Sequence, residues 1–109
     1  MMRTQLSPES RASRELVRAH RSELEKLLEK YQAQNPKFCG SVARGTADSE
    51  SDIDIIVQMD PSLGNVLMRA SGLMEETRKL LGRDDIDIFP EQLLKPEVAR
   101  SVQEDAVDV

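Results

Sequence analysis

Aromatic residues and cysteines are scarce in this chain of 109 residues. Aromatics make up 3% of it, as Tyr31, Phe38 and Phe89, and tryptophan is absent, so we expect a core of Leu, Ile, Val and Met. The single cysteine, Cys39, excludes an internal disulfide and is typical of a reducing compartment. Its apolar setting beside Gly40 predicts a buried, inert thiol rather than a nucleophile.

Long apolar runs and an excess of basic charge are also missing. No segment is long and apolar enough for a signal peptide or a membrane span, so we expect a cytoplasmic protein with no membrane partner. The net charge of −5 argues against direct binding to nucleic acid, which normally needs a basic surface. The length suits one domain over residues 1–109, with residues 1–6 expected as a flexible leader.

Hydrophobic periodicity predicts alternating helices and strands. A long amphipathic helix is expected over residues 10–34, begun by Ser7-Pro8-Glu9 and ended by Asn35-Pro36. Strands are expected over residues 37–39, 52–58 and 84–89, and helices over residues 62–81, after Asp60-Pro61, and 96–104. A strand, a long helix and another strand indicate a right-handed crossover, hence an α/β (α+β) fold with a small sheet packed against helices.

A basic stripe and a lone histidine lie on the first expected helix. The stripe comprises Arg11, Arg14, Arg18 and Arg21. It is either a solvated face or a contact for an acidic partner or phosphate. His20 lies near the apolar edge with no cluster of metal-ligating residues around it, so we interpret it as a packing residue.

Two aspartates alternate with apolar residues on the second expected strand. Asp52 and Asp54 should project from one face of the strand while Ile53 and Ile55 project from the other. The crossover allows Asp87, on the third expected strand, to lie near them. Three such carboxylates suit Mg²⁺, and a pair of ions can assist an in-line displacement at phosphorus. The alternative is a strand whose acids simply face solvent.

A glycine-containing turn precedes these acids at a fixed spacing. Gly40 and Ser41 follow an apolar strand and open a short helical turn, where a free backbone N–H and a hydroxyl can bind phosphate. Arg44 could pair with a phosphate, or brace the loop through Asp48 or Asp52. The turn alone is weak evidence, but its combination with the acids is specific.

Ten residues separate Gly40-Ser41 from Asp52-Ile53-Asp54. This pattern resembles the signature of the DNA polymerase β-like nucleotidyltransferase superfamily. The fuller string around it, with the later segment Ile86-Asp87-Ile88-Phe89-Pro90, is similar to the branch of minimal nucleotidyltransferase (MNT) antitoxins. This resemblance covers essentially the whole chain after the leader. It implies a nucleotidyltransferase fold with a small mixed three-stranded sheet. Asp85 competes with Asp87 for the role of third acid, and Asp87 fits the family segment better.

The resemblance also implies a function and a set of site residues. Asp52, Asp54 and Asp87 would be the catalytic and metal-binding acids, holding Mg²⁺ as two ions. Gly40, Ser41 and Arg44 would bind the nucleotide, which is ATP. Many members of this branch are antitoxins of type VII-like toxin–antitoxin systems, and some transfer AMP to a tyrosine of a cognate HEPN ribonuclease toxin.

Two other functions stay open. The chain could neutralise its toxin by direct binding alone, with a vestigial site. It could instead modify a small molecule such as an aminoglycoside, although no second domain is evident to hold such an acceptor.

Overall fold

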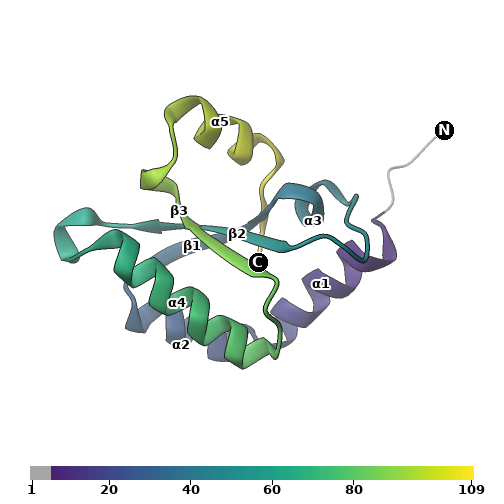
Figure 1. Ribbon diagram of the computed structural model, residues 1–109, viewed down its shortest axis with the longest axis horizontal. Helices are drawn as coiled ribbons and strands as arrows, with labels where there is room; N and C mark the ends of the chain where they lie inside the picture. Colours follow the sequence, from purple (N-terminus) through teal and green to yellow (C-terminus); the bar gives the residue numbers. More distant parts are fainter. Residues whose placement is uncertain (1–5) are drawn as a thin grey trace.

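The computed structural model describes residues 6–109, so all of the expected leader except Leu6 lies outside the described residues. Helices pack on both faces of one sheet (Figure 1). In chain order the elements are α1 (Pro8–Ala19), α2 (Arg21–Lys30), β1 (Ala33–Cys39), α3 (Gly40–Arg44), β2 (Ile53–Met59), the 3-10 helix η1 (Pro61–Leu63), α4 (Val66–Leu81), β3 (Ile86–Pro90), the 3-10 helix η2 (Glu91–Leu93), α5 (Pro96–Asp105) and β4 (Val107–Asp108).

Within the described residues, the sheet has four strands in the order β3-β2-β1-β4, not the three that we expected. The additional strand, β4, pairs antiparallel with β1 through Lys37–Asp108 and Phe38–Val107. A strand of two residues is too short to give an alternating pattern, so periodicity could not predict it. The α/β class itself is confirmed.

The first expected helix is in fact two helices, and it ends earlier than predicted. His20 adopts a non-helical conformation between α1 and α2, and its half-buried ring has Nδ1 3.0 Å from the Leu16 carbonyl oxygen. Asn35-Pro36 lies inside β1 instead of ending a helix. A bulge between Gln34 and Lys37, with Asn35 at φ 53°, lets the strand accommodate a proline that has no N–H. Pairing with β2 therefore overrides the helical periodicity of these residues.

Most of the basic stripe binds backbone carbonyl groups of this chain. Arg14 donates to Val42 and Ala43 in α3. Arg18 donates to the carbonyl of Asp108, and Arg21 donates to that of Val109. Three of the four arginines thus secure α3, β4 and the residue after β4, which neither interpretation of the stripe anticipated.

Helix α4 connects β2 to β3 in the expected crossover, and the two strands pair in parallel. The Asn65 side chain caps its start, and Gly82, at φ 66°, ends it as predicted. The prediction was wrong at the start, because residues 61–63 form η1 and Gly64, at φ 128°, separates that turn from α4. No helix within residues 6–109 is long and apolar enough to cross a bilayer.

The main core lies on one face of the sheet. Helices α1, α2 and α4 cover this face, and α3 and α5 lie on the other (Figure 1). The alternate side chains Ile53, Ile55 and Val57 of β2 are at most 1% exposed within the core. Because strand side chains alternate, Asp54 projects from the opposite face. The fold therefore presents its acids beside α3.

Candidate active site

Strand pairing places two of the predicted acids side by side. Asp54 of β2 is the direct partner of Asp87 in the parallel pairing with β3, and on its other side it is opposite Cys39 of β1. Asp52 lies just before β2 and is exposed, whereas Asp54 and Asp87 are half-buried. The crossover thus brings Asp87 next to Asp54, as the sequence allowed.

Gly40 fits closely against Asp54. It adopts φ +65°, which L side chains rarely adopt, and a Cβ atom built on it would lie 2.6 Å from Oδ2 of Asp54. Only glycine allows the backbone to turn from β1 into α3 at this distance from the carboxylate. Ser41, the second residue of α3, is half-buried beside it. The predicted Gly40-Ser41 turn and the predicted acids therefore meet at one place.

The start of α1 holds the loop that follows this turn. The Ser7 hydroxyl donates to the Ala47 carbonyl at 2.6 Å, and the buried Ser10 hydroxyl accepts from the Ala47 N–H at 2.9 Å. Arg14 binds the carbonyls of α3 from the same helix. These supporting residues were missed by sequence reasoning. The only sequence signal was the Ser7 cap, which identified a helix start but not its long-range partner.

The electrostatics of the site centre on Asp54. Burial raises its pKa to about 6, with further contributions from Asp87 and Asp52, while Arg44 acts in the opposite direction. Burial raises the pKa of the Cys39 thiol to about 12, and the Asp54 charge contributes to this. The prediction of a buried, inert thiol is therefore supported. Three carboxylates close enough to influence one another favour a bound cation.

Arg44 is exposed and pairs with Asp105 of α5, with Nη1 3.9 Å from Oδ2. Among the described residues, neither of the bracing partners considered from sequence, Asp48 or Asp52, forms an ion pair with it. An exposed pair at the observed distance is weak. Within the described residues, the guanidinium of Arg44 is therefore held only weakly.

The two candidates for the third acid have different partners. The Asp85 carboxylate binds Arg83 through both oxygens, and this hydrogen bonding lowers its pKa. Among the described residues, Asp87 has one side-chain partner, with Oδ1 3.2 Å from Nη2 of Arg78. Because Asp87 also lies opposite Asp54, it is the better candidate.

The carboxylates of the site are suitable ligands for Mg²⁺, but their arrangement in the structure is not that of a metal site. Carboxylate oxygens are the hard ligands that this ion prefers, and Asp54 and Asp87 lie in register. However, no group of three or more acidic, histidine or cysteine side chains within residues 6–109 is positioned as a ready metal site. A shift of side chains is needed for Asp52, Asp54 and Asp87 to converge on one ion.

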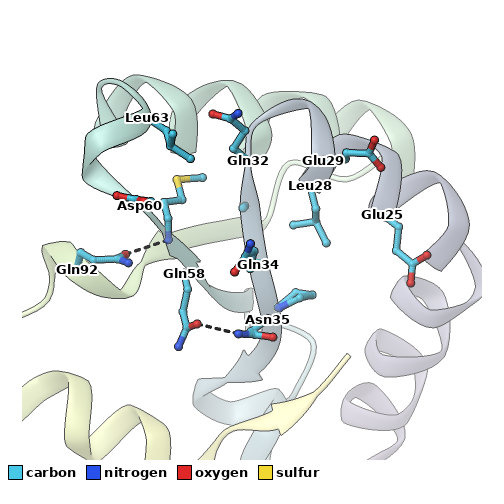
Figure 2. Close-up of a pocket in the computed structure, with 13 residues that line it drawn as sticks. Glu25, Leu28, Glu29, Gln32, Gln34, Asn35, Gln58, Asp60, Leu63 and Gln92 are labelled. Atoms are coloured by element: carbon cyan, nitrogen blue, oxygen red, sulfur yellow. Dashed lines mark hydrogen bonds between the residues drawn. The ribbon is translucent and has the colours of Figure 1, made fainter.

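A hollow far from these acids is a poor candidate for the nucleotide site. It lies where β1 starts and β2 ends, and hydrogen bonds from Asn35 to Gln58 and from the Met59 N–H to Gln92 cross it (Figure 2). Its lining, in the part of the chain that the structure describes, contains Glu25, Glu29 and Asp60 and no lysine, arginine or histidine. A triphosphate would be repelled by this lining, so strand register is the better guide to the site.

A second groove, mostly apolar, adjoins Asp87. Its lining residues come from α4, from β3 and from η2 with the residue after it, and they are Leu67, Ala70, Ser71, Met74, Asp87, Ile88, Phe89, Pro90, Leu93 and Leu94. Three of these apolar side chains, Leu67, Phe89 and Leu93, are unusually exposed. Exposed apolar patches of this kind commonly contact other proteins.

Comparisons with known proteins agree with this fold. The family model of the nucleotidyltransferase domain matches residues 21–109. A Methanocaldococcus jannaschii protein, named as a candidate protein adenylyltransferase, is 32% identical over 96 residues, which cover 88% of this chain and 93% of that protein.

Solved structures also resemble this chain. One described as a candidate minimal nucleotidyltransferase superposes with a TM-score of 0.73 at 32% identity, covering 87% of this chain and 94% of that one. A toxin–antitoxin structure with AMP-PNP superposes with a TM-score of 0.63 at 24% identity, covering 80% of this chain and 69% of that one. The second likeness concerns the fold alone.

Proposed function

Because the chain belongs to the nucleotidyltransferase domain family, we propose that this nucleotidyltransferase is a Mg²⁺-dependent protein adenylyltransferase. It transfers AMP from ATP to a tyrosine of a cognate HEPN ribonuclease toxin and thereby acts as an antitoxin. The observation that carries the proposal is the register of Asp54 with Asp87, directly beside the glycine turn at Gly40. A relative named for protein adenylylation supports the choice of a protein acceptor.

In the proposed reaction, the acceptor hydroxyl oxygen attacks the α-phosphorus of ATP. The new phosphorus–oxygen bond forms as the bond to the bridging oxygen of the leaving group breaks, and pyrophosphate departs with that electron pair. Asp87 accepts the hydroxyl proton, because it lies on the edge strand β3, next to Asp54 and on the open side of it. The Gly40 and Ser41 backbone, the Ser41 hydroxyl and Arg44 bind and orient the phosphates.

Asp52, Asp54 and Asp87 would hold Mg²⁺, as two ions. When bound, Mg²⁺ neutralises charge on the phosphates and on the leaving pyrophosphate. The raised pKa of Asp54 follows from burial and from its two acidic neighbours, and a divalent cation would favour the ionised form at neutral pH. These carboxylates therefore have a physical reason to be close together.

The apolar groove beside Asp87 supports a protein acceptor. An acceptor hydroxyl at Asp87 would bring the surface around it against Leu67, Phe89 and Leu93. An apolar protein surface suits that lining, whereas a polycationic sugar such as an aminoglycoside does not. The solved toxin–antitoxin neighbour with AMP-PNP has the same fold, which is compatible with this arrangement.

Neutralisation by direct binding alone is the second candidate function. Two observations favour it: Asp87 is paired with Arg78, and the three acids do not converge on one point within the described residues. Such a protein would need the groove but not the acids.

One experiment separates the two functions. The purified protein is incubated with α-labelled ATP, Mg²⁺ and the toxin encoded beside it. We expect label on the toxin with the wild type, and none with Asp52→Ala or Asp54→Ala although both still bind the toxin. Asp84→Asn, an exposed acid near β3, is the matched control and should label normally. If the wild type and all variants inhibit the toxin and none of them labels it, direct binding is established instead.

A further inference from the structure

We infer that Arg78 is a positioning residue that holds Asp87 at the open edge of the sheet and competes with a divalent metal for it. This inference rests on the proposed function, because it assigns a role to a residue next to the proposed metal site. It also gives a reason why Asp87 does not join a ready metal site within the described residues.

Strand β3 is an edge strand, and its backbone groups alternate between two directions. Ile53 N–H donates to the Asp85 carbonyl, so Asp85 and Asp87 direct their backbone groups toward β2. Ile86 and Ile88 must then direct theirs toward the open edge, since parallel pairing uses every second residue. The Ile86 carbonyl accepts from Arg78 Nε at 2.8 Å. The guanidinium of Arg78 therefore lies at the open edge of the sheet.

This position fixes the direction in which Arg78 pulls Asp87. The same guanidinium donates through Nη2 to Asp87 Oδ1 at 3.2 Å. Asp54 lies on the other side of Asp87, because β2 pairs with β3 opposite the open edge. One oxygen of Asp87 is thus drawn away from Asp54.

Arg78 is well placed for this role because it has two anchors. Its own carbonyl accepts from the N–H groups of Gly82 and Arg83, which close the end of α4. Its side chain makes two hydrogen bonds to β3, one to backbone and one to carboxylate. The Arg78 and Asp87 side chains are 32% and 35% exposed, so the pair is partly shielded from water. A lysine at this position could provide the charge but not the two-point contact.

The pairing also affects the charge of the site. Asp52, Asp54 and Asp87 are three like charges in a small volume, and before metal binds, Arg78 offsets part of their repulsion. A metal that takes Asp87 as a ligand must share or displace this cation. Removal of Arg78 should therefore strengthen metal binding rather than weaken it.

Metal titration tests this inference without ATP or toxin. Mn²⁺ binding to the wild type and to Arg78→Met is measured by electron paramagnetic resonance. We expect roughly threefold tighter binding in Arg78→Met, the size expected for loss of a partly exposed ion pair. Arg83→Met is the matched control, because Arg83 lies at the same turn and pairs with Asp85. It removes the same charge and should leave Mn²⁺ affinity nearly unchanged.

Two further variants make the outcome decisive. Asp87→Asn combined with Arg78→Met should remove the gain, because the competition concerns Asp87. Arg78→Lys serves if Arg78→Met does not fold, and it should show a smaller gain in affinity. Unchanged or weaker Mn²⁺ binding in Arg78→Met, or an equal gain in Arg83→Met, overturns the inference while leaving the proposed transfer of AMP intact. Absence of Mn²⁺ binding in every variant overturns both.

Discussion

A Cβ atom on Gly40 would lie 2.6 Å from Oδ2 of Asp54. This closeness ties the turn after β1 to the acid on β2, and it gives the glycine two separate reasons to be there. The positive φ of +65° is the first, and the missing side chain is the second. Gly40 and Asp54 therefore constrain each other, and a substitution at either position should change the site.

We expect Gly40→Ala to lower both stability and activity. The methyl group must displace the Asp54 carboxylate, and alanine is strained at this φ, so the free energy of unfolding should fall by about 1–3 kcal/mol. Chemical denaturation gives the stability, and AMP transfer gives the activity. Gly82→Ala is the matched control, since Gly82 has nearly the same φ, +66°, but open space around it. Equal loss of activity in both variants would contradict a specific role for the contact with Asp54.

Asp54→Asn should stabilise the metal-free protein at neutral pH. Burial raises the pKa of Asp54 to about 6, so the folded state binds the proton more tightly than the unfolded state does. Ionisation of Asp54 therefore costs stability above pH 6, and the cost disappears as the pH falls toward the ordinary value of 3.8. Because the group is partly exposed, the cost is on the order of 1 kcal/mol.

Thermal unfolding in the presence of a chelator, from pH 4 to pH 8, measures this effect. The advantage of the variant should grow as the pH rises toward 6 and should level off above that value. If the difference in stability between variant and wild type is constant over the whole range, the surroundings do not disfavour the ionised form of Asp54.

Ser10→Ala should loosen the support of the site. The fully buried Ser10 hydroxyl accepts from the Ala47 N–H, and its loss leaves a buried donor without a partner at a cost of about 1–3 kcal/mol. Hydrogen exchange should rise at residues 45–48. Ser101→Ala is the control, because it removes an exposed hydroxyl on α5 and should have little effect. Unchanged hydrogen exchange in Ser10→Ala would contradict the stabilisation of this loop by α1.

Gly72→Ala should destabilise the protein although alanine normally favours a helix. A Cβ atom at Gly72, inside α4, would lie 2.6 Å from the Tyr31 ring, and that ring is held by Glu76 and Lys30. We expect a loss of about 1–3 kcal/mol instead of the gain of about 1 kcal/mol usual for this change. In a Tyr31→Ala background, where the clash is gone, Gly72→Ala should raise the free energy of unfolding, as measured with denaturant. A stabilising Gly72→Ala alone would contradict the contact.

Leu93→Asp should weaken toxin binding without affecting the acids. The side chain is 54% exposed in the groove beside Asp87, and a charge there would be desolvated against an apolar partner. We expect at least a tenfold weaker affinity for the toxin by calorimetry, or about 1.4 kcal/mol, with Mn²⁺ binding retained. Val98→Asp, an exposed apolar residue outside that lining, is the control. Equal affinities in both variants would exclude the groove as the docking surface.

The parts of the fold that follow from local chemistry were predictable. The crossover through α4, the Gly82 stop and the helical turn at Gly40 each depend on a periodic face or on a residue with special backbone freedom. The family predicted from Gly40-Ser41 and the spaced aspartates is confirmed by the comparisons. The roles of the individual site residues stay predictions.

Other features depend on long-range contacts that one sequence does not reveal. Asn35-Pro36 indicates a helix end until β2 pairs beside it and a bulge accommodates the proline. The spacing of Arg14 and Arg18 predicts either a solvated face or a contact for an acidic partner or phosphate, because their actual carbonyl partners lie far along the chain. The contact of Arg78 with Asp87 could not be predicted because it depends on where α4 packs against the edge of the sheet.

The most direct test of the proposed function is mass spectrometry of the toxin after coexpression with the wild type or with Asp87→Asn. Asp87 lies opposite Asp54 in the strand register, and Asp87→Asn keeps the size of the side chain and all the apolar residues of the groove. We predict that a tyrosine of the toxin carries AMP after coexpression with the wild type, and that the toxin bound to Asp87→Asn is unmodified. An inhibited but unmodified toxin with the wild type, or equal modification with Asp87→Asn, would contradict the account.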